Sequence, residues 1–270
     1  MDVVCVGDCG IDHYLPSGER MFGGITANFA RHARREFSAG DTIHIVSCVG
    51  DDDGGEFVRR GLENSGIECH VSMLHGSTPV QYIEVADDGE RRFVRYDEGV
   101  LRDFRFTVEQ ARLIATSDLL VAPVYLQIVG LFDELLSTPA SGRVAIDFAD
   151  FGQHPEFSLL DKHLRDIDIA FFGLTAHDPA IAELQRLADM HEKLFIVTLG
   201  PDGSVAFDGS ARFDCPASPV VRVVDTTGAG DAYAAAFLAR YCHGADIPDA
   251  MEHAASLAAK IIGQIGTYRR

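Results

Sequence analysis

Short apolar segments alternate with longer helical segments along most of this chain, and this alternation restricts the fold most strongly. The first apolar segment, residues 3–6, is rich in β-branched side chains and is ended by Gly7, which predicts a buried strand. A helix over about residues 25–37, a strand over 42–49 and a helix over 53–65 follow. The order β-α-β-α favours a parallel sheet with helices on its faces.

The same alternation returns in the second half of the chain after an interruption. Residues 8–22 are typical of a loop, and three short strands are expected at 69–74, 80–86 and 91–96, the last two joined by a turn at 87–90. The later elements are expected as strands over 118–122, 143–147, 168–172 and 195–199, a helix over 176–191, a hairpin over 205–208 and 211–215, and two final helices over 229–243 and 248–265.

These elements predict one domain over residues 1–270 with an α/β fold. Its core would be a doubly wound, mostly parallel sheet flanked by helices. A small antiparallel β lid would come from about residues 13–22 and 69–100. Such an insert is often a cover over a site or a contact between copies of a chain.

The charge balance excludes several functions. The chain has 41 acidic and 23 basic residues and a net charge of −18, which argues against nucleic-acid binding because that binding depends on attraction to phosphates. A small nucleotide ligand stays compatible, because a glycine loop and Mg²⁺ can neutralise phosphates locally. No apolar run reaches about 18 residues, so no membrane span is expected. The six cysteines form no CxxC pair, which indicates reduced thiols and a cytoplasmic location.

The segment from Asp225 to Asp231, Asp-Thr-Thr-Gly-Ala-Gly-Asp, is the most informative motif. Gly228, Ala229 and Gly230 lie where a loop meets an alanine-rich helix, so backbone N–H groups can approach an anion and the helix dipole supports it. This arrangement suits a phosphoryl group in transfer. Asp231 is placed to accept the proton of an attacking hydroxyl. The alternative is that Asp231 is a first-turn acid and the glycines only form a turn.

A second glycine-led helix start occurs near the N-terminus. Gly23 and Gly24 precede Asn28, whose amide would be one turn into the helix and available to hydroxyl groups. Asp8 and Asp12 follow the first strand, at the sheet edge where α/β proteins bind ligands. Each carboxylate could grip two adjacent sugar hydroxyls. The alternatives are an exposed helix residue for Asn28 and solvated loop acids for the aspartates.

The two motifs together resemble the signatures of the ribokinase-like (PfkB-type) sugar kinases. Residues 197–203, Val-Thr-Leu-Gly-Pro-Asp-Gly, are similar to that family's nucleotide-side strand and turn, and residues 49–55 to a further family segment. The resemblance extends over nearly the whole chain in the right order. It implies an ATP-dependent kinase that uses Mg²⁺ and phosphorylates a primary hydroxyl of a sugar held under the lid.

The resemblance also assigns roles to residues. Asp231 would be the general base, and the N–H groups of Gly228, Ala229 and Gly230 would form the anion hole. Asp12, Gly24 and Asn28 would hold the sugar. The nucleotide would lie along Thr198, Gly200, Gly203 and Gly228. Asp225 and Thr227 match positions that hold a monovalent cation, such as K⁺, in some members.

One family motif is missing. Many members carry Asn-x-x-Glu after the strand that corresponds to 168–172, where it helps to organise Mg²⁺. Here the chain has Gly-Leu-Thr-Ala-His-Asp over residues 173–178. We therefore assign no metal ligand and expect ATP oxygens and water to hold Mg²⁺. Asp178 is a candidate substitute for the missing motif, but no other residue in the sequence supports it.

The substrate is suggested by a finer resemblance, to the fructoselysine 6-kinase subgroup. The compact segment 7–12 and the hairpin passage 91–100 carry it. A fructose linked to an amino acid needs charged partners, and Arg92, Arg95 and Glu98 are suitable, unless they only form an exposed charged lid. Tyr125 or Gln127 could line the sugar pocket.

Three interpretations of the activity stay open. The first is a fructosamine kinase, or a kinase of a simple ketose such as fructose. The second is a nucleoside kinase, because the two signatures do not separate ribose-bearing nucleosides from ketoses. The third is a sugar-binding sensor that has lost turnover. A Rossmann dehydrogenase is disfavoured, since no GxGxxG follows the first strand. The lid's open edge further predicts a homodimer joined through the lid sheets.

Overall fold

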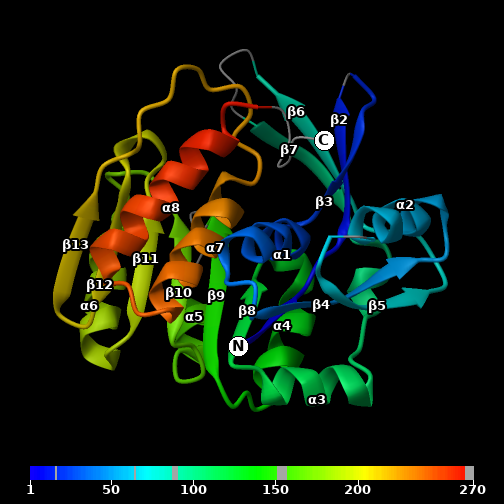
Figure 1. Cartoon of the computed structure of the whole chain (residues 1–270), viewed down its shortest axis with the longest axis horizontal. Coiled ribbons are helices and arrows are strands. Elements are labelled where there is room, and N and C mark those ends of the chain that lie inside the picture. Colours follow the sequence, from blue (N-terminus) through cyan, green and yellow to red (C-terminus); the bar gives the residue numbers. More distant parts are fainter. Residues whose placement is uncertain (16, 64, 87–90, 151–156, 265–270) are drawn as a thin grey trace.

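A nine-stranded sheet with helices on both faces forms the body of the molecule (Figure 1). The computed structural model describes residues 1–264 except 16, 64, 87–90 and 151–156, and leaves out 265–270. The strand order is β13-β12-β11-β10-β9-β8-β1-β4-β5. Neighbours from β5 to β11 pair in parallel, whereas β12 and β13 are antiparallel additions at one edge.

The strands of this sheet are close to those expected from the apolar segments. They are β1 (Asp2–Val6), β4 (Thr42–Gly50), β5 (Glu68–Leu74), β8 (Leu119–Pro123), β9 (Arg143–Asp150), β10 (Ile169–Gly173), β11 (Leu194–Thr198), β12 (Ser204–Asp208) and β13 (Ala211–Cys215). The doubly wound, mostly parallel α/β fold is thereby confirmed.

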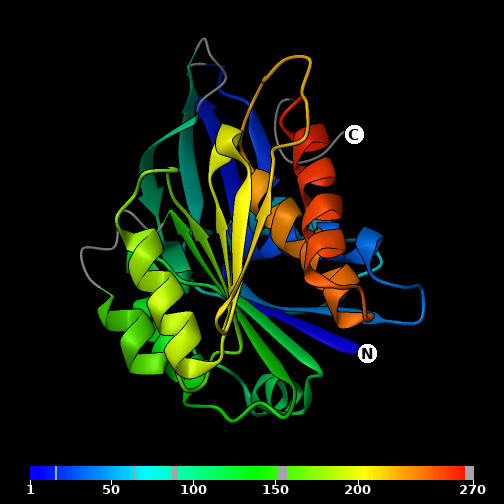
Figure 2. The same cartoon turned by 90° about the vertical axis from the view of Figure 1, so that its left-hand side faces the viewer.

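Helices cover the two faces of the sheet as separate layers (Figure 2). The helices of the first layer, with the short α2 beside the lid, are α1 (Ile25–Glu36), α2 (Asp53–Leu62), α7 (Ala229–Cys242) and α8 (Ile247–Ile261). Those of the second layer are α3 (Val108–Thr116), α4 (Val129–Leu136), α5 (Ser158–His163) and α6 (Ala180–His191). The short 3₁₀ helices are η1 (Gly99–Asp103), η2 (Leu126–Ile128) and η4 (Gly200–Asp202). Each layer closes its own apolar core against one sheet face.

Helix α7 is buried on all sides rather than along one stripe. Its residues 231–239 are all buried, because it packs between α1 and α8 while Phe237 contacts Phe171 of the sheet edge to face. A helix that is apolar all round belongs in an interior. The alanines allow this close packing, and the helix holds its N-terminus firmly at the carboxyl edge of the sheet.

A second sheet of four strands, the lid, stands above the carboxyl edge of the body (Figures 1 and 2). Its order is β3 (Arg20–Gly23), β2 (Gly10–Leu15), β6 (Val80–Val85) and β7 (Arg91–Asp97). Two of its pairings are antiparallel, and β2 with β6 is parallel.

Three expectations need correction. Residues 8–22 are not a loop, because they contain β2 and β3. Residues 69–74 are not part of the lid, because β5 pairs with β4 at the edge of the main sheet; the expected lid range of 69–100 therefore begins too early. The last helix ends at Ile261 rather than 265. The expected turn at 87–90 lies outside the described residues.

Within the described part of the chain, no helix is both long and apolar enough to cross a membrane.

Candidate active site

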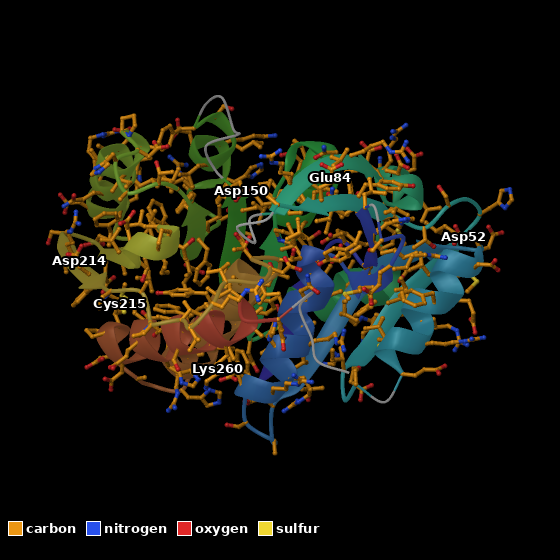
Figure 3. The ribbon with its side chains drawn as sticks, turned by 90° about the horizontal axis from the view of Figure 1, so that it is seen from above. Asp52, Glu84, Asp150, Asp214, Cys215 and Lys260 are labelled. Carbon is orange, nitrogen blue, oxygen red and sulfur yellow. The ribbon has the colours of Figure 1, made fainter. Side chains whose placement is uncertain are left out.

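The candidate site lies at the edge where the parallel strands end. Ligands of open α/β sheets bind outside the carboxyl ends of the strands, and this edge lies beneath the lid (Figure 1). Figure 3 looks onto it from above: Asp150, at the end of β9, lies between Asp214 of β13 and Glu84 of the lid. Asp147 and Asp150 are carboxylates at this edge that the motifs did not single out.

The N-terminus of α7 is built to receive an anion. Gly228 adopts left-handed backbone angles, φ 76° and ψ 4°, as the residue before the first helical turn. Among the described residues no side chain caps this helix, and a Cβ at Gly230 would meet no atom within 4 Å. Since the first N–H groups of a helix have no acceptor within it, those of α7 can donate to a negatively charged ligand, although that of Ala229 also donates to the carbonyl of Thr226 at 3.3 Å. Asp231, in the first turn, is buried, with 8% of its surface exposed.

The N-terminus of α1 differs because it is already capped. Asp8 Oδ2 and Oδ1 accept hydrogen bonds from the backbone N–H groups of Ile25 and Thr26, each at 3.0 Å. Burial raises the pKa of the Asp8 carboxyl, although these bonds oppose the shift. Gly24 has φ 103°, and a Cβ there would lie 2.9 Å from the Asp8 carbonyl oxygen. Position 24 therefore requires glycine, because any larger residue would collide with Asp8. The sequence pattern did not reveal this reason.

Two further residues expected to bind sugar are buried near this point. Asp12 lies on β2 with 6% of its surface exposed, and its carboxylate occupies the space that a side chain at Gly23 would need. Asn28 lies one turn into α1 and is also buried, at 4%. Asp12 is thus not a solvated loop acid, and Asn28 is not on an exposed helix surface.

A tyrosine that the motifs missed joins the lid to the loop before α7. The hydroxyl of Tyr14, on β2, donates to Asp225 Oδ2 at 2.9 Å. Asp225 Oδ1 accepts from the N–H of Thr227 at 2.8 Å. Asp225 is fully buried. The signal in the sequence is the strand spacing, since Tyr14 follows Asp12 by two residues and so shares its face of the strand.

A second pair of tyrosines joins the lid to the body. Tyr96 of β7 and Tyr125, after β8, have their hydroxyl oxygens 3.1 Å apart and their rings edge to face. Burial raises the pKa of both hydroxyls, and the charge of Asp8 adds to the effect. Tyr125 thus lies close to Asp8, whereas Gln127 is exposed; a role of Tyr125 in the sugar pocket stays a prediction.

Arg92 and Arg95 of the lid do not lie on the face that carries Asp12. Arg92 lies opposite Glu84 in the ladder, and Tyr82 lies opposite His13. Since successive side chains alternate between faces, Arg92 belongs to the lid face turned away from Asp12. The expected sugar contact of Arg92 therefore needs correction. Arg95 also lies on that outer side, over the ring of Tyr82 and paired with Asp97.

Glu98 follows β7 and forms an ion pair with Arg102 in η1. Its charge also acts on the Tyr96 hydroxyl, so Glu98 lies at the lid–body junction.

The residues expected along the nucleotide form one tight turn after β11. Thr198 Oγ1 donates to the carbonyl of Phe172 at 3.4 Å, which ties β11 to β10. Gly200 and Gly203 have positive φ of 58° and 94°, and the N–H of Leu199 closes the turn on the carbonyl of Gly203 at 2.8 Å. A Cβ at Gly200 would meet no atom within 4 Å, so this backbone is open to a ligand.

The described residues supply a single buried side-chain oxygen without a hydrogen-bond partner at this site and no cluster of metal ligands. Among the described residues, no group of three or more His, Cys, Asp or Glu side chains could hold a metal. Asp178 already has a protein partner, because its Oδ1 accepts from the N–H of Ala180, the first residue of α6, at 2.9 Å. Thr227 Oγ1 is buried and has no hydrogen-bond partner in the described part of the chain, so it offers one oxygen to a small cation.

A pocket of about 280 Å³ lies beside α6, and Leu199 of the turn after β11 is one of its lining residues. His177, Asp178 and Arg212 are also among its lining residues, and none of the residues expected to bind sugar or phosphate is.

Comparison with known proteins identifies the class. The pattern of the pfkB family of carbohydrate kinases matches residues 2–269, and the chain belongs to this family. It is a sugar kinase, a phosphotransferase with an alcohol acceptor. Kinases of this family use ATP, typically with Mg²⁺.

The individual relatives include kinases that are named for different acceptors. A fructoselysine 6-kinase of Shigella flexneri is 33% identical over 266 residues, which cover 97% of this chain and 98% of that protein. A fructosamine kinase of Bacillus subtilis is 27% identical over 276 residues, which cover 99% and 93%. The crystal structure of adenosine kinase from Sinorhizobium meliloti superposes with a TM-score of 0.85 at 24% identity, covering 99% of this chain and 95% of that one. The last similarity shows the fold alone.

Proposed function

We propose that this protein transfers the γ-phosphoryl group of ATP to the 6-hydroxyl of a fructosamine such as fructoselysine. The observation that carries the proposal is the identity of 32–33% with fructoselysine 6-kinases over 97% of the chain. The geometry supports the reaction, because an uncapped helix N-terminus lies next to a buried carboxylate at the ligand-binding edge of the sheet.

The residues divide the work as follows. Asp12, Gly24 and Asn28 orient the sugar hydroxyls, with Glu98 near the amino-acid end of the substrate. Asp231 accepts the proton of the primary hydroxyl as it attacks in line. The N–H groups of Gly228, Ala229 and Gly230 stabilise the charge that develops on the phosphoryl oxygens. Thr198, Gly200 and Gly203 border the nucleotide. Mg²⁺ carried by ATP would neutralise phosphate charge, and Asp225 with Thr227 would hold K⁺.

Replacement of Asp231 by Asn tests this division. The variant keeps the size of the side chain and removes the base, so kcat should fall by about 10²–10⁴-fold. Activity is measured with ATP and a panel of fructoselysine, fructose, ribose and adenosine, and circular dichroism checks the fold. Turnover within about tenfold of the parent would contradict the mechanism.

A nucleoside kinase is the second candidate, because a nucleoside kinase of Methanocaldococcus jannaschii is 25% identical over 274 residues, which cover 91% of this chain. Thermal-shift measurements separate the two. Stabilisation by adenosine and by none of the sugars supports the nucleoside. A sensor without turnover would bind a sugar yet transfer no phosphate under saturating Mg²⁺ and ATP.

A further inference from the structure

Tyr14 connects two parts of the candidate site that are far apart in the chain. Its hydroxyl bonds to Asp225, 211 residues away. Asp12 and Tyr14 are both buried and lie two residues apart on β2, so their side chains share one face of the strand. One short strand therefore carries an expected sugar ligand and a direct bond to the loop that leads into α7.

Asp225 is the fixed point of that loop. Its carboxylate receives Tyr14 on Oδ2 and the N–H of Thr227 on Oδ1. The backbone N–H groups of Val224 and Asp225 both donate to the carbonyl of Ile262, after α8, at 2.8 and 3.3 Å. Tyr14 is the contact from the lid side. Gly228, with its left-handed backbone, comes three residues after Asp225, and the N–H groups at the start of α7 follow directly.

Loss of the hydrogen bond between Tyr14 and Asp225 should change the conformation of the loop before α7, because the bond is buried. Burial raises the pKa of the Tyr14 hydroxyl, so it stays protonated and donates. Asp225 has none of its surface exposed, so water cannot easily replace a missing donor. Leaving a buried carboxylate without a donor costs more free energy than the hydrogen bond itself contributes. The turn can lower this cost if it reorients so that Asp225 reaches another donor.

We propose that Tyr14 is a positioning residue for phosphoryl transfer. By holding Asp225 it fixes the turn over residues 225–228, and with it the first N–H groups of α7, relative to the strand that bears Asp12. Tyr14 itself contacts no reacting atom. The inference rests on the proposed function in one respect, since it takes the N-terminus of α7 as the phosphoryl site.

The test compares Tyr14→Phe with Tyr82→Phe. Both replacements remove only a hydroxyl from the lid, and Tyr82 lies opposite His13, on the other face of the sheet. For Tyr14→Phe, kcat should fall by about tenfold or more while the KM for the sugar stays within about threefold, because the loss lies in the transition state. Tyr82→Phe should leave both constants unchanged. Melting temperatures are recorded for each variant.

An unchanged kcat in Tyr14→Phe overturns the proposal, whether or not the melting temperature falls, because the hydroxyl would then only stabilise the fold. A double-mutant cycle with Asp225→Asn adds a second criterion. Tyr14→Phe should lower kcat less when Asp225→Asn is already present than in the parent, and strictly additive losses contradict the coupling.

A wrong substrate assignment can be distinguished from a wrong role for Tyr14. If the parent phosphorylates ribose or adenosine but not fructoselysine, the same comparison is made with that acceptor. If the parent phosphorylates none of them, slow hydrolysis of ATP without sugar is measured, and Tyr14→Phe should reduce it by a similar factor.

Discussion

The carboxylate of Asp8 closes the N-terminus of α1 by accepting from Thr26 at 3.0 Å, through a bond that spans 18 residues of sequence. Two helices of the described residues begin directly after a glycine, α1 after Gly24 and α7 after Gly228, and this bond distinguishes them. At α1 the first N–H groups of the helix already donate to the Asp8 carboxyl group. At α7 no side chain of the described residues takes that role. The positive end of α7 is therefore the one left for a phosphoryl group.

Replacement of Gly230 by Ala tests this difference. The added methyl group meets no protein atom within 4 Å, so stability should hold or rise by about 0.5–1 kcal/mol, as expected for Gly to Ala in a helix. If phosphate approaches the backbone here, the methyl group obstructs it and kcat should fall by about 10–100-fold. Steady-state kinetics and urea unfolding measure the two effects.

Gly130→Ala is the matched control. Gly130 is likewise the second residue of its helix, α4, and a Cβ there would also meet no atom within 4 Å. It should gain similar stability and keep full activity. Equal activity of both variants would contradict an anion site at α7.

The sequence predicted the body of the fold better than the lid, for a physical reason. Strands such as β1 and β10 are continuous apolar segments because both of their faces are buried. Strand β2 instead turns Asp12 and Tyr14 toward the body, so polar residues occupy its inner face and hide the period of two. Membership of β5 in the main sheet depends on its pairing with β4, which no local pattern encodes.

In the candidate site, too, features formed by neighbouring residues were predicted, and contacts between distant segments were not. The helix start at Gly228 and the acid at Asp231 are local features, and a motif can show them. The cap from Asp8 to α1, the Tyr14–Asp225 bond and the Tyr96–Tyr125 contact join distant segments. Arg92 shows the opposite error, because its chemistry suited an amino-acid substrate but the strand register turns it outward.

Glu98→Gln should discriminate between substrates with and without an amino-acid group. If Glu98 faces the ammonium group of fructoselysine, the KM for fructoselysine should rise by about 10–150-fold, the cost of a lost charge-assisted bond, while the KM for fructose should stay unchanged. The ion pair with Arg102 is exposed on the arginine side, at 69%, so its loss should change stability little.

Two controls accompany this measurement. Arg102→Gln removes the ion pair but keeps the Glu98 charge, and it should not raise the KM for fructoselysine. Glu84→Gln removes a charge from the outer lid face and should leave all constants unchanged. Equal effects of Glu98→Gln on fructose and fructoselysine would exclude a role at the amino-acid end.

The lid edge predicts a homodimer. On the edge strand β7, Phe93 and Val94 are about half exposed, at 48% and 52%, and a sheet edge that presents apolar side chains is normally paired or covered. We expect the parent to sediment as a dimer of 29.3 kDa chains at micromolar concentration, and Phe93→Lys to shift it to the monomer. Val108→Lys, at a more exposed valine on α3, should leave the dimer intact. A parent that sediments only as a monomer would contradict the prediction.

His32, buried on α1, should make stability fall in acid. Burial lowers its pKa to about 3, and the charges of Arg35 and Arg31 add to the effect. In the unfolded chain its pKa is about 6.5, so between these values the unfolded state binds more protons and stability rises with pH. The stability linked to His32 is therefore complete above about pH 6.5 and is lost as the pH falls toward 3, by roughly 2 kcal/mol at pH 5.

Urea unfolding of the parent and of His32→Gln at pH 7.5 and pH 5 measures this contribution. The Gln variant has a neutral side chain at both values, so it should lose about 2 kcal/mol less than the parent on acidification, whatever its absolute stability. His75→Gln is the control with the opposite sign. Hydrogen bonding to Asp51 raises the pKa of the His75 side chain, so removing it should not reduce the acid sensitivity. If the free energy of unfolding changes equally in the parent and in His32→Gln between pH 7.5 and pH 5, then His32 is protonated in the folded protein at pH 5, which would contradict the prediction.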